Sequence, residues 1–246
     1  MARYYVEPHN FTEDTVTISG DDVKHIRNVL RGAVGDKLTI CDCCGTVYNT
    51  EIASIDTEIV CKILDKKPDE NEPDVRLTVV QAIPKGDKME SIIQKCVELG
   101  VSRIIPVYSE FTVVKADPKG DANKLVRWQR IAKEAAKQCC RGIIPTVDAP
   151  AKLKNVAKPD EDEVGLMAWE RGMGDPRDII QTCGNKVRIL IGSEGGFSAQ
   201  EAQWAQDNGY TLISMGPRIL RSETAGPALS AAIMFATGNW NNRQER

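Results

Sequence analysis

Two stretches near the end of the chain share one pattern, in which an apolar run breaks into a loop of glycines and ionisable residues and a helix signal follows. The first stretch is Ile189–Ser198 and the second is Met215–Ala225. In an open α/β sheet, such loops lie together at the carboxyl ends of the strands, where ligands bind. The pattern therefore predicts an α/β sheet with a ligand site at these loops.

The first loop lacks the features of a phosphate cradle. A P-loop requires Gly-Lys-Ser/Thr, and a dinucleotide fingerprint requires G-x-G-x-x-G with an acid about 20 residues further on. Here Glu194 stands among the glycines Gly192, Gly195 and Gly196, where its charge would repel a phosphate. We expect a ligand that is neutral or cationic near this point.

The segment Asp65–Asp74 is the clearest linker in the chain, because it is charged, contains two prolines and has no apolar period. The region before it is rich in alternating stretches that predict strands at Thr15–Ser19, Lys37–Cys41, Val47–Ile52 and Glu58–Leu64. Asp21–Arg31 reads as one amphipathic helix. Its buried stripe is expected to hold Val23, Ile26, Val29 and Leu30. Many short strands with one helix predict a small β-barrel.

After the linker, strands alternate with helices, which predicts a mostly parallel sheet. Strands are expected at Val75–Ile83, Arg103–Tyr108, Val164–Ala168, Val187–Ile191 and Thr211–Met215. Helices are expected to begin after Asp87, at Lys124, after Ser198 and at Thr224. Asp87 and Ser198 each precede a Glu by three residues, which is the capping-box spacing, and Pro227 suits a first helical turn. The predicted domains are 1–70 and 73–246.

The cysteines do not indicate a metal site. Of 8 cysteines, Cys41–Cys44 supplies one C-x-x-C spacing, and the second pair that zinc needs is offered only by the adjacent Cys139 and Cys140. We expect free thiols in a reducing cytosol and no metal. No apolar run approaches the ~18 residues of a membrane span. The N-terminus lacks a signal-peptide layout, so we expect a cytoplasmic protein without membrane contact.

Basic residues recur along two of the expected helices. The net charge of −3 excludes a bulk polycation, so a nucleic-acid partner would require a local basic surface. The basic residues are Arg127, Arg130, Lys133, Lys137 and Arg141 on the long helix, and Lys24, His25, Arg27 and Arg31 on the first. Each set fits a solvated face as well as it fits phosphate contacts.

Charges also crowd the second loop, where Arg218, Arg221 and Glu223 flank two aliphatic residues. One interpretation is an internal Arg–Glu ion pair that closes the loop. The other is a ligand pocket in which arginine and glutamate face a substrate. The residues alone leave both interpretations open.

At these residues the chain resembles the ribosomal RNA small subunit methyltransferase E family of the SPOUT superfamily. The resemblance rests first on Gly192–Gly196 and Gly216–Ala225, then on Lys85–Gly100 and Trp128–Arg141, and at the front on Arg3–Val6 and His25–Arg31. Their order and spacing carry it. The family's glycine loop usually has proline where this chain has Ser193, and we expect the loop to be looser here. The Cys41–Cys44 cluster also departs from the family, and no role is inferred for it.

The resemblance implies a PUA-like RNA-binding β-barrel (1–70) followed by an α/β SPOUT domain with a trefoil knot (73–246). It implies a homodimer that uses S-adenosyl-L-methionine to methylate N3 of one uridine in small-subunit ribosomal RNA, either free or in the assembled small subunit. The alternatives are a methyltransferase for another ribosomal or transfer RNA base, and a non-catalytic RNA-binding protein of ribosome assembly.

Roles for individual residues follow from the resemblance together with their chemistry. Glu223 is the expected acceptor of the N3 proton, with Glu170 as second candidate, and Arg221 is expected to stabilise charge on the base. The expected cofactor-binding residues are Ala168, Glu170, Ile191, Gly192, Gly195, Gly196, Met215, Gly216, Ile219, Leu220 and Thr224. The expected RNA-binding residues are Arg3, Lys24, Arg27, Arg31, Lys88, Arg130, Lys137 and Arg141.

Overall fold

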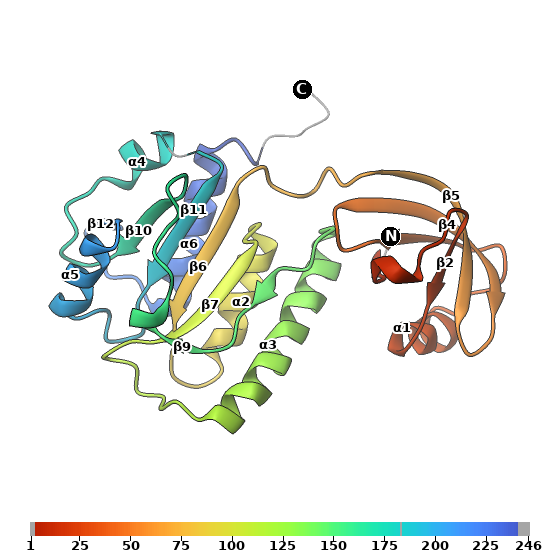
Figure 1. Ribbon diagram of the computed structural model, residues 1–246, viewed down its shortest axis with the longest axis horizontal. Helices are drawn as coiled ribbons and strands as arrows, with labels where there is room; N and C mark the ends of the chain where they lie inside the picture. Colours follow the sequence, from red (N-terminus) through yellow and green to blue (C-terminus); the bar gives the residue numbers. More distant parts are fainter. Residues whose placement is uncertain (1–2, 183, 241–246) are drawn as a thin grey trace. The chain divides into compact units, whose positions relative to one another are not determined.

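The computed structural model describes residues 3–182 and 184–240. The chain divides into two compact units, of which the first holds Met1–Glu72 with Ala136–Ile144 and the second holds Pro73–Ala135 with Pro145–Arg246. Residues 136–144, which the sequence assigns to the second domain, thus belong to the first unit. Figure 1 shows the two units in the colours of the sequence.

The first unit is built on one sheet with the strand order β1-β3-β4-β5-β2. The strands are β1 (Arg3–Tyr5), β2 (Thr15–Ile18), β3 (Lys37–Cys41), β4 (Thr46–Ile55) and β5 (Ile59–Pro68). β1 runs parallel to β3, and the other neighbours are antiparallel. Alternation places Val16 and Ile18 of β2 with Ile40, Ile52 and Ile59 in the core of this unit.

Two expectations for the first unit are wrong. β5 extends into the expected linker as far as Pro68, because Asp65–Pro68 pair with Thr46–Asn49 of β4 by backbone hydrogen bonds that need no apolar side chains. The expected helix is only α1 (Asp21–Lys24) followed by a π-helical turn, η2 (His25–Val29). The wider π turn carries later residues off the buried face, so Val29 and Leu30 are 66% and 50% exposed.

The second unit contains a sheet with the order β12-β10-β11-β6-β7-β8, and β9 pairs with β7. Its strands are β6 (Arg76–Ala82), β7 (Arg103–Tyr108), β8 (Thr146–Val147), β9 (Ala151–Lys152), β10 (Val164–Ala168), β11 (Lys186–Ile191) and β12 (Tyr210–Ile213). Every neighbouring pair is parallel, which confirms the prediction from the strand–helix alternation.

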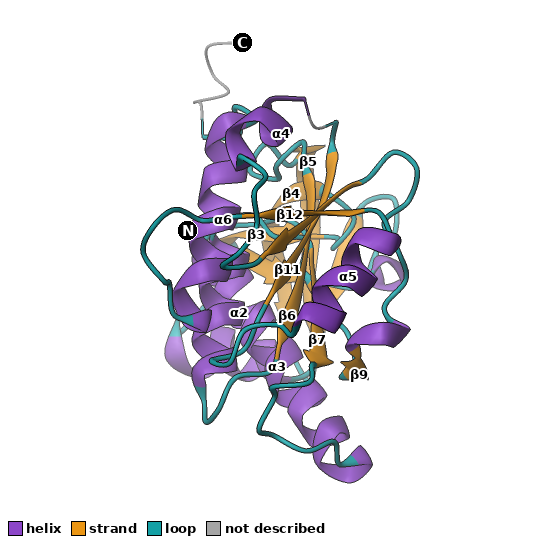
Figure 2. Cartoon of the chain, turned by 90° about the vertical axis from the view of Figure 1, so that its left-hand side faces the viewer, coloured by secondary structure: helices purple, strands orange, loops and turns teal. Residues whose placement is uncertain are grey.

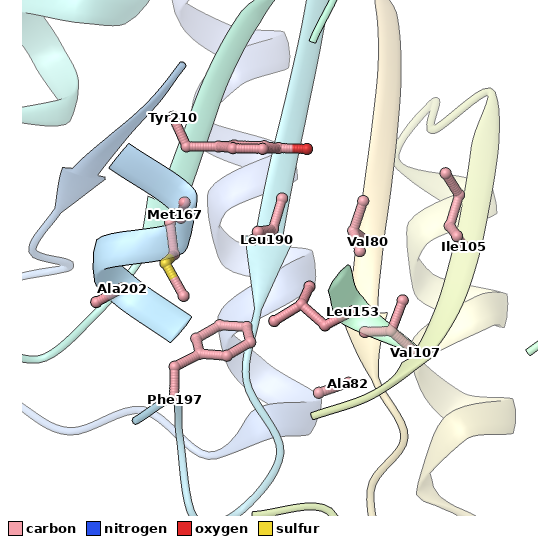
Figure 3. Packing of buried hydrophobic residues seen from close by; sticks show 11 residues of the cluster. Val80, Ala82, Ile105, Val107, Leu153, Met167, Leu190, Phe197, Ala202 and Tyr210 are labelled. Carbon is pink, nitrogen blue, oxygen red and sulfur yellow. The ribbon is translucent and has the colours of Figure 1, made fainter. Parts of the chain in front are cut away.

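Helices cover both faces of this sheet, with α5 on one side and α2 and α6 on the other (Figure 2). The α-helices after α1 are α2 (Lys88–Glu98), α3 (Pro118–Gln138), α4 (Pro176–Thr182), α5 (Ala199–Asp207) and α6 (Ser222–Ala236). Short 3-10 turns lie at η1 (Pro8–Asn10) in the first unit and at η3 (Leu153–Asn155) in the second. Under α5, residues such as Val80, Leu190, Met167 and Phe197 form one apolar cluster (Figure 3).

Helix starts separate the correct predictions from the wrong ones. Ser198 and Glu201 form both bonds of the capping box of α5. Asp87 makes no side-chain cap at α2. α3 begins six residues before the expected Lys124, and α6 begins at Ser222, so Pro227 lies in its second turn.

The strand order determines where the loops meet. β12, β10 and β11 are adjacent and parallel, so the loops that follow them emerge at one edge of the sheet. After β12 the chain returns to α6, which contacts β6, β11 and α2. The loops after β10, β11 and β12 and the first turn of α6 therefore gather in one place.

Candidate functional site

These loops enclose a cavity of about 880 Å³. Its walls are residues 168–171, 191–197 and 214–220, with Ser222 and Ala225 of α6. All of the predicted cofactor-binding residues line it except Thr224, which is exposed and whose N–H donates to the Arg221 carbonyl. The loops that the sequence pattern indicates therefore surround this cavity.

The residues Gly192–Phe197, here called the glycine loop, leave little room for side chains. A Cβ on Gly192 would lie 2.8 Å from the Cα of Gly196, and one on Gly195 would lie 2.7 Å from the Cβ of Phe111. Gly196 has a φ of 68°, in the left-handed region. The loop is therefore a close backbone turn that only glycine fits at these positions.

Ser193 does not leave the loop unattached. Its side chain is buried, and its hydroxyl donates to the carbonyl of Phe111 at 3.4 Å. A proline at this position would have no hydroxyl to donate. The substitution therefore adds a contact to the loop, whereas the sequence suggested only a loosening.

A buried polar network attaches the start of the glycine loop to the start of α6. The Ser222 hydroxyl donates to the Gly192 carbonyl at 2.7 Å, and the Gln81 amide donates to the Ser222 hydroxyl at 3.0 Å. Gln81 is fully buried on β6. Because buried polar groups are costly unless they are bonded, this network holds three elements in register.

The carboxylate of Glu194 is held by the segment before α2. It accepts from the Lys85 N–H at 3.2 Å and from the Lys88 ammonium at 2.9 Å. Burial alone would raise the pKa of Glu194, but the Lys88 hydrogen bond and backbone N–H donors lower it below its usual value. The acid in the glycine loop thus has partners within the protein, which the expectation of a ligand-facing charge did not include.

Glu223 also contacts Lys88, at 3.3 Å between Oε2 and Nζ. Backbone N–H donation at the start of α6 lowers the pKa of Glu223, and Lys88 and the charge of Arg221 add to this. The expected Arg–Glu pairing is therefore only a charge interaction, and the close ionic contact of Glu223 is Lys88. Arg221 is exposed at the N-cap of α6, and Glu170 is exposed on the cavity wall, 3.8 Å from Arg171.

The expected RNA-binding residues other than Lys88, which pairs with Glu194 and Glu223, fall into two groups. Lys24, Arg27, Arg31 and Arg130 are exposed. Arg3, Lys137 and Arg141 instead form ion pairs within the first unit, with Asp69 at 2.7 Å, Asp22 at 2.9 Å and Glu72 at 2.7 Å. The side chains of Arg3 and Arg141 are largely buried, so their charges serve the internal structure of that unit.

Sequence reasoning missed several residues of the site. Phe197 and Ser222 line the cavity, and the Gln81 amide donates to the Ser222 hydroxyl from the buried side. One signal for Gln81 was available, because it is the polar residue at the end of an apolar strand. Ser222 had none beyond its position between Arg221 and Glu223.

Two features are absent from the described residues. In residues 3–182 and 184–240, no group of three or more His, Cys, Asp or Glu side chains is arranged to hold a metal ion. Within the same part of the chain, no helix has the length and apolar character to cross a membrane.

Comparison with known families defines the class first. The family model described as the RNA methyltransferase domain matches residues 70–234, and the PUA domain of RNA methyltransferases matches residues 18–64. The chain is 32% identical to ribosomal RNA small subunit methyltransferase E of Bacillus subtilis, over 96% of this chain and 97% of that protein. The chain belongs to the ribosomal RNA small subunit methyltransferase E family.

Solved structures agree with this assignment. The crystal structure of ribosomal RNA small subunit methyltransferase E from Neisseria gonorrhoeae, bound to S-adenosyl methionine, has a TM-score of 0.86 and 31% identity and covers 96% of this chain and 97% of its own. A methyltransferase from Legionella pneumophila, solved with the bound cofactor, has a TM-score of 0.84 and 29% identity over 96% of this chain and 97% of its own.

Proposed function

We propose that this protein transfers a methyl group from S-adenosyl-L-methionine to N3 of a uridine in small-subunit ribosomal RNA. The observation that carries the proposal is the cavity at the three loops, in a chain that spans nearly the full length of the relatives named above. The uridine N3 position comes from the family resemblance.

The cavity suits the cofactor in size and chemistry. Its volume of about 880 Å³ lies in the range of small-molecule sites. Ile191, Leu220 and Ala225 supply apolar surface, and the tight glycine loop allows backbone groups to approach a ligand closely. When bound, the cofactor supplies a methyl group on a positively charged sulfur, which an acidic rim such as Glu170 tolerates.

The N3–H of uridine is a weak acid and must lose its proton before or during methyl transfer. We assign Glu223 as the acceptor, because Lys88 and the helix start keep its carboxylate charged and in place. Glu170 is the second candidate, because it lines the cavity directly. Arg221 lies two residues before Glu223. We assign to it the stabilisation of the negative charge that develops on the carbonyl oxygens of the base. The base must be unpaired or extruded for N3 to be reached.

The finer architecture belongs to the same proposal. We infer that the sheet of the first unit closes into a PUA-like barrel. We also infer that the return of the chain from β12 to α6 completes the trefoil knot of SPOUT proteins. The protein is further proposed to work as a cytoplasmic homodimer. On α6, Leu229 and Ile233 are buried in the chain itself, while Ala232, Phe235 and Ala236 are exposed and available to a second copy. Light scattering measures the mass.

The first unit is proposed to supply RNA affinity through its exposed cations Arg27 and Arg31. Charge reversal at both is expected to weaken RNA binding and to flatten its dependence on salt, because each lost phosphate contact lowers the slope by about 0.7–0.9. Cofactor affinity should stay unchanged. A normal salt slope in the double variant would refute this assignment.

The decisive experiment maps the modified nucleotide. Small subunits from cells lacking this protein are incubated with the purified chain and methyl-labelled cofactor, and the RNA is digested for mass spectrometry. The proposal expects one N3-methyluridine in the small-subunit RNA. A methyl group on another base or in transfer RNA would support the first alternative, and cofactor binding or RNA binding without transfer would support a non-catalytic assembly role.

A further inference from the structure

We infer that Lys88 is a positioning residue that joins the cofactor loop to the carboxylate at the start of α6, and is not an RNA-phosphate contact. The inference rests on the proposed function for the identity of the ligand. It reassigns a residue that the family resemblance, together with its charge, placed among the expected RNA-binding residues.

The geometry is that of a three-way bridge. Lys88 is the first residue of α2, and its Nζ lies 2.9 Å from Oε1 of Glu194 and 3.3 Å from Oε2 of Glu223. Glu194 lies on the cavity wall, and Glu223 is the second residue of α6, directly after the wall residue Ser222. One ammonium thus connects three segments that are far apart in the sequence.

The Lys88 ammonium is already paired with these two carboxylates. The side chain of Lys88 is 33% exposed, and the side chains of Glu194 and Glu223 are 30% and 25% exposed. The hydrogen bond to Glu194 and the pair with Glu223 raise the pKa of Lys88 above its ordinary value. A phosphate would have to displace two carboxylates, whereas neighbouring Lys85 is exposed and presents its own ammonium to solvent.

The bridge has a clear consequence for the cavity. Both carboxylates lie within reach of one nitrogen, so without Lys88 two like charges would face each other across the wall. Arg221 is the other cation that acts on Glu223, and the Lys85 N–H still binds Glu194. Repulsion would then move the glycine loop away from α6, and the cavity would lose the shape in which a ligand fits.

The test measures two quantities in Lys88→Gln: cofactor affinity by calorimetry, and the salt slope of RNA binding. A bridge predicts that the dissociation constant for S-adenosyl-L-methionine rises about 3- to 10-fold, as expected for the loss of partly exposed ion pairs. The RNA salt slope should stay at the wild-type value. The matched control is Lys95→Gln, which removes an exposed charge two turns further along α2 and should leave cofactor affinity unchanged.

Two further measurements separate the bridge from a general loss of structure. The deficit of Lys88→Gln should shrink between about pH 8 and pH 5, because protonation of one carboxylate relieves the repulsion. Lys88→Arg should restore most of the affinity. The effects of Lys88→Gln and Glu194→Gln should be less than additive in the double variant. If Lys88→Gln alone does not fold, removal of one of the two like charges should restore folding in that double variant.

Each outcome decides between the assignments. Wild-type cofactor affinity with a reduced salt slope in Lys88→Gln would make Lys88 a phosphate contact and overturn the inference. Wild-type values of both quantities would also overturn it. So would additive effects of the two substitutions in the double variant. A wild-type chain that binds no S-adenosyl-L-methionine would overturn the proposed function and the inference together. A binding wild type with an unaffected Lys88→Gln would overturn the inference alone.

Discussion

The two loops on either side of the cavity differ in how the chain holds them. The glycine loop is attached through Gly192 to Ser222, through Ser193 to Phe111, and through Glu194 to Lys85 and Lys88. Residues 214–221, here called the β12 loop, are exposed from Gly216 to Ile219, and Ile219 is 87% exposed. In the β12 loop the Gly216 N–H bonds only as far away as Ser214.

The difference indicates a division of labour within one site. The shape of the glycine loop is set by the chain itself, so it can present backbone groups without rearrangement. The shape of the β12 loop depends on few contacts within the described residues, so we expect the proposed ligand to restrict it further. Affinity and chemistry should therefore depend more on the fixed side than on the exposed side.

The largest effect is expected at Glu223, the fixed carboxylate where the β12 loop enters α6. Glu223→Gln keeps the shape and removes the charge, so methyl transfer should fall about 10²-fold or more while cofactor and RNA affinities hold. The defect should shrink at high pH, where the imide ionises without help. Rates are measured as label incorporated over a pH series.

A second outcome for Glu223→Gln is a structural role. If Glu223 serves mainly as the partner of Lys88, the variant should lose stability in a melting curve, because an ammonium is left with one carboxylate fewer. A stable variant with wild-type turnover would remove both roles and move the proton acceptor to Glu170.

The next effect tests the fixed loop directly. Gly192→Val places a branched side chain against the backbone of Gly196, where even a Cβ would be 2.8 Å from the Cα. Overpacking costs about 1–3 kcal/mol of folding stability. Because the loop must shift to relieve it, cofactor affinity should fall by at least about 5-fold, read by calorimetry. Gly184→Ala, which has open space around its Cβ position, is the control. Equal affinities in the two variants would mean that the ligand does not use this loop.

A smaller effect concerns the exposed loop. Amide hydrogen exchange should be faster in residues 214–221 than in residues 192–197, because exposed loops open with free energies near zero. Addition of S-adenosyl-L-methionine should slow exchange in the β12 loop more, by no more than about tenfold, or about 1.4 kcal/mol. Equal protection of both loops before the ligand is added would contradict the difference drawn here.

The features that the sequence predicts well are local or periodic. Lys37–Cys41 is a strand with the expected bounds, Ser198 and Glu201 make the expected capping box, and the loops after β11 and β12 do meet at a cavity. Each follows from alternation, from a three-residue spacing, or from the rule that parallel strands end at one edge.

The features that the sequence misses depend on partners that are distant along the chain. Arg141 reads as the end of a basic stripe, but Glu72 lies 2.7 Å from it in the first unit. The sequence predicts that the charge of Glu194 faces a ligand, but its carboxylate forms an ion pair with Lys88 at 2.9 Å. Val29 reads as buried, and the π turn exposes it. A periodic pattern does not include contacts between residues that are distant along the chain. It therefore cannot predict which charged side chains form ion pairs or which apolar side chains become exposed.

The smallest expected effect is the contribution of Glu194, in the glycine loop, to the pH dependence of the free energy of unfolding. Glu194 has a lowered pKa in the folded chain, whereas the β12 loop contains no carboxylate. The folded state then binds fewer protons than the unfolded state, so this contribution is complete above the ordinary glutamate pKa of about 4.3 and is lost as pH falls through the folded value. Glu194→Gln should therefore show a flatter decline in the free energy of unfolding between about pH 5 and pH 3, by less than about 1 kcal/mol for a partly exposed pair. Denaturant melts across this range measure it, with Glu170→Gln as the control from the exposed wall. A slope that changes as much in Glu170→Gln as in Glu194→Gln would show that the contacts of Glu194 with Lys85 and Lys88 are not the cause of the pH dependence.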